Sequence, residues 1–239
     1  MNTAQSTRRF VITSLLTILV PIVLFGPQAY AETYVAGQFG VALPSIGGGL
    51  TDVDLTGVFP AGSTMSDRAL KTSALYGAKL GYFFPQAPWF GIETEIFNTT
   101  PHIKEQSTTV SVPSSPTVTG GTTTATVSGD HFRVLTWAPL NLVFRYHKSR
   151  LQPYVAVGPG IFFSRVESTA TGFEGSQSDT KLGLNTQAGF RYYMTRHVTV
   201  FGEWKYDYTR FSFKENDTQF GFDGTYSMHQ VAFGVGYHF

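Results

Sequence analysis

The sequence ends in His229-Gln-Val-Ala-Phe-Gly-Val-Gly-Tyr-His-Phe239, and this stretch decides the fold class. Every second residue counted back from the end is bulky and apolar, whereas the residues between them are small or polar. A β-strand points successive side chains to opposite faces, so the stretch has one aromatic and aliphatic face and one face rich in glycine. The small face cannot fill a protein core. The pattern therefore indicates a strand whose bulky face meets lipid and whose small face meets a narrow lumen.

The N-terminus has the layout of a secretory signal peptide. Arg8 and Arg9 precede an apolar run over residues 10–25, and Ala29-Tyr-Ala31 provides a cleavage site. An uncleaved anchor helix is the alternative, but the run is shorter than the ~20 residues that a spanning helix needs and contains Pro21. We expect residues 1–31 to be a cleaved signal peptide and residues 32–239 to form one domain.

Composition agrees with an exported membrane protein that has no helical span. Without the two arginines of the signal peptide, 15 of the 17 basic residues remain against 16 acidic residues, which gives no basic bias for nucleic acid. Charged residues make up 14% of the chain and aromatic residues 15%, and mean hydropathy is near zero. Such values are typical of transmembrane barrels, because every second residue of each strand is polar. The chain has no cysteine, which excludes disulfides and thiolate chemistry.

Eight segments alternate with period two, and the connections between them alternate in length. Three connections are tight turns, at residues 85–88, 147–150 and 195–196, and four are long and polar, at residues 44–70, 99–130, 165–180 and 213–224. This connectivity predicts an all-β fold, an eight-stranded antiparallel up-and-down transmembrane β-barrel with its short turns in the periplasm. The expected strands are residues 33–43, 71–84, 89–98, 131–146, 151–164, 181–194, 197–212 and 225–239.

Aromatic residues gather beside the tight turns. Amphipathic rings favour the membrane–water interface, so we expect a periplasmic girdle there and an outer girdle higher on strand 197–212. The periplasmic set is Tyr82, Phe84, Trp89, Phe90, Tyr146, Tyr192, Tyr193, Tyr237 and Phe239, and the outer set is Trp204, Tyr206 and Tyr208.

Residues 32–239 resemble the small outer-membrane barrels typified by the outer membrane protein A transmembrane domain and the neisserial opacity proteins. The resemblance lies in short phrases: Tyr34-Val-Ala-Gly-Gln-Phe-Gly40, Leu80-Gly-Tyr-Phe83, Pro153-Tyr-Val-Ala-Val-Gly-Pro-Gly160, Gln187-Ala-Gly-Phe-Arg-Tyr192 and Phe201-Gly-Glu-Trp-Lys-Tyr206. It implies the bacterial outer membrane as the location and Phe239 as the assembly signal. The family includes surface antigens, adhesins, small channels and envelope-stabilising proteins. We expect no periplasmic peptidoglycan-binding domain, and hence no cell-wall tether.

With the bulky register pointing outward, a set of polar side chains points into the barrel. An eight-stranded barrel has room inside only for its own side chains, so these charges must pair. We expect Lys79 to pair with Glu93 and Arg191 with Glu203 near Gln187, and Arg145 to lie at the wet rim. The predicted interior network, to which we assign a structural role, is Lys79, Glu93, Glu95, Asn141, Arg145, Gln187, Arg191, Glu203, Lys205 and Asp207, with Asn185 and Gln230 in the same register.

Two local features bear on this assignment. Pro139 cannot donate to the sheet ladder, so we expect a bulge there that flips the register of strand 131–146. Thr-Val alternation in Thr108–Val112 and Thr124–Val127 allows two interpretations of loop 99–130, a hairpin or an irregular low-complexity tip.

The sequence contains no recognisable catalytic, cofactor-binding or metal-binding pattern. The six histidines lack metal-ligand spacing, and Ser227 and His229 share one face of a strand without any other part of a catalytic arrangement. We expect no enzyme activity and no cofactor.

The function that we expect is a structural or surface-interaction role, with long extracellular loops contacting a partner. A low-conductance channel is the first alternative and a lipid-modifying enzyme the second. Expected partners are outer-membrane lipid and lipopolysaccharide, the outer-membrane assembly machinery and a surface partner, with no nucleic acid and a monomeric state.

Overall fold

The computed structural model describes residues 32–44, 46, 48–57, 59–114, 118–127, 129–168, 175–216 and 220–239. The predicted signal peptide lies outside the described residues. Within the described part of the chain there is no helix, and so none long and apolar enough to cross a membrane.

Twelve antiparallel strands make up the molecule. They are β1 Glu32–Ala42, β2 Gly49–Thr56, β3 Thr64–Met65, β4 Ser73–Phe84, β5 Ala87–Thr99, β6 Gln106–Val112, β7 Gly121–Val127, β8 His131–Arg145, β9 Leu151–Ser168, β10 Gly175–Tyr193, β11 Val198–Phe213 and β12 Gly221–His238.

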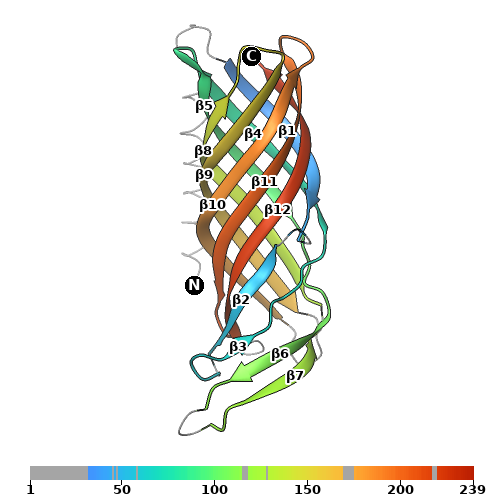
Figure 1. Ribbon diagram of the computed structural model, residues 1–239, viewed down its shortest axis with the longest axis vertical. Coiled ribbons are helices and arrows are strands. Elements are labelled where there is room, and N and C mark those ends of the chain that lie inside the picture. Colours follow the sequence, from blue (N-terminus) through green and yellow to red (C-terminus); the bar gives the residue numbers. More distant parts are fainter. Residues whose placement is uncertain are drawn as a thin grey trace, which may run out of the picture.

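Eight of these strands close into a ring. Their order is β1-β4-β5-β8-β9-β10-β11-β12, and β12 pairs back with β1, from Tyr34 opposite His238 to Ala42 opposite Gln230. Figure 1 shows the long tilted strands wrapped around a common axis. The ring confirms the predicted eight-stranded up-and-down barrel, and each of its strands overlaps one of the eight predicted segments. Because the ring is closed, no barrel strand has a free edge whose backbone N–H and C=O groups would lack partners in lipid.

The other four strands extend the sheet beyond one end of the barrel. β2 pairs with the first part of β12, β3 pairs with β2, β6 with β3, and β7 with β6. Of the two interpretations of loop 99–130, the hairpin is therefore the correct one: β6 and β7 pair from Gln106 opposite Val127 to Val112 opposite Gly121. This extension lies at the end opposite the short turns (Figure 1).

The prediction of a long polar loop at residues 165–180 was wrong. β9 and β10 stay paired through Ser168 opposite Gly175, so the strands continue well beyond the expected ends. The β10–β11 ladder, in contrast, stops at Leu184 opposite Tyr208. Beyond it the described residues are joined by bonds that use side chains: Thr209 Oγ1 donates to Leu182 O at 3.0 Å, and Ser212 N donates to Asp179 Oδ2 at 2.6 Å.

The bulge predicted at Pro139 is present. The β8–β9 register shifts between Trp137 and Leu142, and the β5–β8 register shifts at the same level. Even-numbered residues of β8 up to Ala138 are buried in the barrel, whereas from Asn141 onward the odd-numbered residues are buried. The bulge therefore decides that Asn141 and Arg145 point inward.

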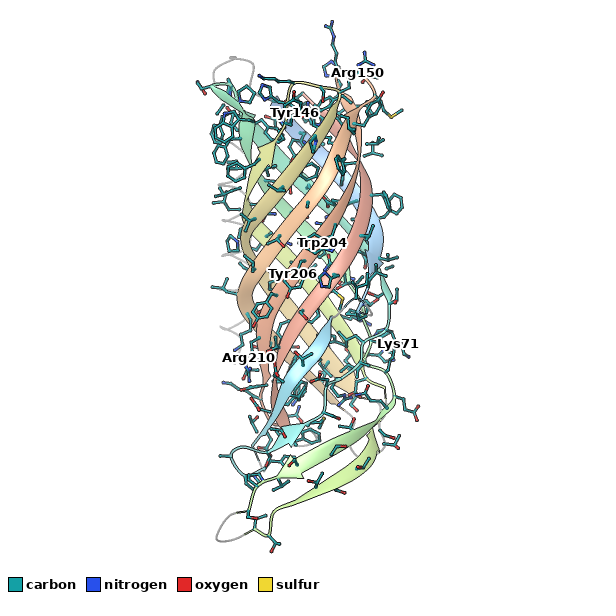
Figure 2. The ribbon with its side chains drawn as sticks, viewed as in Figure 1. Lys71, Tyr146, Arg150, Trp204, Tyr206 and Arg210 are labelled. Carbon is teal, nitrogen blue, oxygen red and sulfur yellow. The ribbon has the colours of Figure 1, made fainter. Side chains whose placement is uncertain are left out.

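Most aromatic residues beside the short turns face outward as predicted. Stacking joins neighbouring strands in this girdle, as between Phe84 and Phe90 at 5.5 Å and between Trp89 and Phe144 at 6.1 Å. Tyr193 is a correction: its hydroxyl points inward to Glu32, since it follows Tyr192 and adjacent strand residues face opposite sides. Figure 2 shows Tyr146 near the short turns and Trp204 and Tyr206 near mid-barrel.

Phe239, the predicted assembly signal, lies at the seam that closes the barrel. Its backbone N donates to Thr33 O at 2.9 Å, and its ring is 68% exposed and contacts Tyr237 edge-on. The exposed ring is free for contact with lipid or with another protein. Its role in assembly stays a prediction.

The topology predicts which segments are reachable from outside an intact cell. An epitope tag inserted at Gly120, at the far end of the β6–β7 hairpin, should bind antibody on intact cells. A tag at Ser149, in the turn between β8 and β9, should bind antibody only after the outer membrane is permeabilised. Equal labelling of both tags on intact cells would contradict the orientation.

Candidate functional site: the polar interior of the barrel

Neighbouring strands bring most of the predicted interior side chains together in one layer of the barrel. The strand register places Lys79 opposite Glu95, Gln187 opposite Lys205, and Glu93 opposite Asn141. All ten predicted residues are buried, each less than a tenth exposed. Because buried charges are costly when they have no partner, a layer with this many buried charges is stable only if the charges pair with one another.

Lys79 is the hub of the layer. Its Nζ donates to Glu93 Oε1 at 3.2 Å, to Gln187 Oε1 at 2.7 Å and to Glu203 Oε2 at 2.9 Å, and it lies 3.5 Å from Glu95 Oε2. One ammonium thus reaches three carboxylates contributed by two different strands. The predicted Lys79–Glu93 pair is part of this larger group.

Lys205 shares two of these carboxylates with Lys79, those of Glu95 and Glu203. Its Nζ donates to Glu95 Oε2 and lies 3.3 Å from Glu203 Oε1. Gln187 Nε2 donates to the second oxygen of Glu95, and Gln38 Nε2 donates to Oε2 at 3.1 Å. Two lysines and two amides therefore crosslink β1, β4, β5, β10 and β11 across the lumen.

The expected Arg191–Glu203 pair is absent among the described residues, and this prediction was wrong. The Arg191 guanidinium lies over the Tyr34 ring at 4.1 Å from its centroid and 5.4 Å from that of Tyr154. The two tyrosine hydroxyls donate to Glu93 and Glu203, respectively. The tyrosines therefore stand between the cation and the carboxylates, and the guanidinium is stabilised by aromatic faces instead.

Arg145 lies near the rim but is not solvated, which corrects a second expectation. Its guanidinium donates through two nitrogens to the Glu32 carboxylate and through Nε to Pro88 O at 2.8 Å, and it stacks 3.4 Å above the Phe83 ring. Tyr193 and His238 also contact Glu32. This paired charge covers the interior at the end of the barrel that carries the short turns.

Asp207 and Asn141 differ from the rest of the set. Asp207 accepts bonds from Asn185 Nδ2 and Gln230 Nε2, both at 2.8 Å, and within the described chain no cation forms an ion pair with it. Asn141 is fully buried beside the bulge, and neither polar atom of its side chain has a hydrogen-bond partner among the described residues. Lys79, Lys205 and their carboxylates, rather than these two, hold the layer together.

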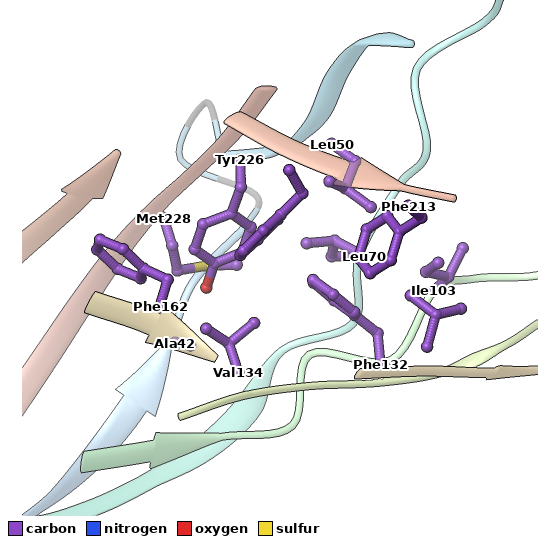
Figure 3. Close-up of a cluster of buried hydrophobic side chains, with 12 residues drawn as sticks. Ala42, Leu50, Leu70, Ile103, Phe132, Val134, Phe162, Phe213, Tyr226 and Met228 are labelled. Atoms are coloured by element: carbon purple, nitrogen blue, oxygen red, sulfur yellow. The ribbon is translucent and has the colours of Figure 1, made fainter. Parts of the chain in front are cut away.

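A second, apolar layer fills the barrel on the side of the charges that faces away from the short turns. Its members are Ala42, Leu50, Leu70, Ile103, Phe132, Val134, Phe162, Val166, Phe211, Phe213, Tyr226 and Met228, each 3% exposed or less. Figure 3 shows these side chains converging from several strands and from the segments around Leu70 and Ile103. The charged and apolar layers are thus stacked in series inside the described part of the barrel.

The apolar layer is not among the features predicted above, although the sequence contains its signal. Phe211 and Phe213 have the same parity on β11 as Glu203 and Lys205, so they face inward too. The assumption that bulky residues face outward concealed them. It likewise concealed Tyr34, Tyr154 and Phe201, which are buried among the inner charges.

No group of histidine, aspartate and glutamate side chains in the described residues is arranged to hold a metal ion. The His229 ring lies between two outward-facing aromatic rings, 5.6 Å from Trp204 and 4.8 Å from Tyr206. This histidine therefore sits on the lipid-facing side, away from the interior.

Known outer-membrane proteins are similar to this chain in sequence pattern and in fold. A family model described as the outer membrane protein beta-barrel domain matches residues 17–239. Among solved structures, outer membrane protein OprG from Pseudomonas aeruginosa is 18% identical with a TM-score of 0.55, over 87% of this chain and 96% of that chain. Neisserial surface protein A is 10% identical with a TM-score of 0.50, over 88% of this chain and 100% of that chain. These likenesses show the fold alone. No curated protein matches the chain.

The hub position of Lys79 predicts a large loss of stability when it is replaced. Lys79→Met leaves Glu93 and Glu203 short of a buried cation and should lower the free energy of unfolding by about 3–5 kcal/mol. Urea unfolding in lipid vesicles, followed by tryptophan fluorescence, measures this loss.

Arg210→Gln is the matched control. Arg210 pairs with Asp54 at 2.6 Å, but both side chains are about half exposed, so its loss should cost about 0–1 kcal/mol. If Lys79→Met is no more destabilising than this control, the interior charges do not hold the barrel together.

Proposed function

Because the chain belongs to the outer membrane protein beta-barrel family, we propose that it is a non-conducting barrel of the bacterial outer membrane whose extracellular sheet extension binds a partner. The observation that carries the proposal is the filled interior. Lys79, Lys205 and three glutamates close the charged layer, and the apolar layer lies in series with it. A filled barrel contributes rigidity and an anchor, and recognition then falls to the parts outside the membrane.

Side-chain contacts fix the extension to the barrel. Buried Arg68 pairs with Asp130 at 3.3 Å, which ties the segment after β3 to the start of β8. Gln106, at the base of β6, donates to Asp67 O and accepts from Ala69 N. Val53, Leu55 and Met65 form a small core against Val110. These contacts support a preformed binding surface.

The free edge of β7 is the part of this surface best suited to a partner. β7 ends the sheet order, and among the described residues it pairs only with β6. Its sequence, Gly121-Thr-Thr-Thr-Ala-Thr-Val127, contains no charged residue and no proline, the usual protections of an exposed edge. An extended peptide could add to such an edge as a further strand. We therefore assign partner binding to β7.

We also propose how the protein is placed in the membrane and the cell. Lipid and lipopolysaccharide surround the barrel, the outer-membrane assembly machinery inserts it, and it functions as a monomer without cofactor or catalytic activity. Contact with lipid is supported by the outward faces of the strands, where Phe39, Leu182 and Phe233 are each more than half exposed.

A photo-crosslinking amino acid at Thr123 tests the proposal in intact cells. It should form an adduct with a protein partner, and the adduct should weaken at least about tenfold when Thr122→Lys and Thr124→Lys place charges on the edge strand. Adduct yield on a denaturing gel measures the effect.

Ser111→Lys and Thr109→Lys form the control pair. They lie directly opposite Thr122 and Thr124, but on β6, which is an inner strand of the sheet. This pair should leave the adduct largely intact. An absent adduct, or one equally reduced by both pairs, would contradict binding at the β7 edge.

A further inference from the structure

The outward faces of β8 and β9 change abruptly from apolar to basic. Leu135 and Phe163 are opposite each other on these strands and are 36% and 40% exposed. Two residues further from the short turns, Arg133 lies opposite Arg165, and both are exposed on the same outward face. The change marks the level at which lipid chains end and headgroups begin.

Three more basic or titratable side chains adjoin this arginine pair. His131 precedes Arg133 on the same face, and its ring lies 4.8 Å from that of His102. Lys71 lies beside them, since its backbone N donates to His102 O at 2.7 Å. Figure 2 shows Lys71 at the end of the barrel near the extension. We call these five residues, Lys71, His102, His131, Arg133 and Arg165, the basic rim patch.

The positive charge of the patch is only partly compensated by the protein. Glu167 pairs with Arg165 at 2.6 Å, but among the described residues neither Lys71 nor Arg133 forms an ion pair. Burial lowers the pKa of His102, and the neighbouring charges of His131, Lys71 and Arg133 lower it further. Like charges directly opposite on neighbouring strands destabilise a sheet, so an external anion would stabilise this site.

We propose that the basic rim patch binds the phosphate groups of lipopolysaccharide in the outer leaflet of the outer membrane. The proposal deepens the lipid part of the proposed function and does not depend on the β7 edge. The acyl chains would pack on Leu135 and Phe163, while the phosphates would accept hydrogen bonds from Arg133, Arg165 and Lys71. Lipopolysaccharide has both acyl chains and phosphates, so it matches both the apolar and the basic half of this surface.

Binding of purified lipopolysaccharide to the full chain in detergent tests the proposal. The double variant Arg133→Gln, Arg165→Gln should bind at least about tenfold more weakly than the wild type, since it loses two charge-assisted contacts. The wild type should bind enzymatically dephosphorylated lipopolysaccharide with a similar loss. The second comparison uses only the wild type, so it holds even if the double variant folds poorly.

Arg210→Gln is again the control, because Arg210 is also an exposed arginine on a barrel strand but is paired with Asp54 on β2. It should change the affinity by less than about twofold. Equal affinity for intact and dephosphorylated lipopolysaccharide, or equal losses in the two variants, would overturn the proposal. So would binding of inorganic phosphate that matches that of lipopolysaccharide, since the patch would then be a small-anion site. Crosslinking from Thr123 should be unaffected by the rim variants, which separates this test from that of the β7 edge.

Discussion

The narrow interior of an eight-stranded barrel is the constraint on which the rest of this structure depends. The space inside holds side chains and little else, and a charge placed there without a partner costs several kcal/mol. Lys79 and Lys205 meet this constraint by sharing the carboxylates of Glu95 and Glu203. Removing either lysine would leave more than one buried carboxylate without that cation, so the layer behaves as a unit rather than as separate pairs.

Glycine on the small face of the strands makes this packing possible. A Cβ atom at Gly81 would lie 2.3 Å from the Tyr34 ring, and one at Gly234 would lie 2.3 Å from the Phe201 ring. The space left by each glycine is thus taken by an aromatic ring from a neighbouring strand. Tyr34, seated in this way, reaches Glu93 with its hydroxyl and Arg191 with its ring. The glycine-rich face of the sequence therefore indicates inward rings rather than an empty lumen.

The sequence predicted the barrel well because its strongest signals are local. Period-two alternation located all eight strands, and Pro139 located the bulge that turns Asn141 and Arg145 inward. The partners of the inner charges were harder to predict, since they depend on distances across the lumen. Register alone relates Lys79 to Glu95, but only the closed ring brings Lys79 to Glu203.

Two further features depended on information that no single strand carries. Arg191 was expected to pair with Glu203, yet Tyr34 and Tyr154 from β1 and β9 intervene. The apolar layer combines Phe211 of β11 with Leu70 and Ile103, which lie in segments between strands, so reading strands singly did not reveal it. The basic rim patch could not be predicted from single strands either, because Lys71 and His102 are far apart in the sequence and are joined by a backbone hydrogen bond.

The central claim is that charged and apolar layers in series close the barrel. Single-channel conductance in planar lipid bilayers tests it most directly, because an ion that crosses must pass both layers. We predict that the purified wild-type protein, folded and inserted, gives no steady current above the bilayer baseline at moderate voltages. A large and steady conductance from the wild type would contradict the claim and would favour a channel.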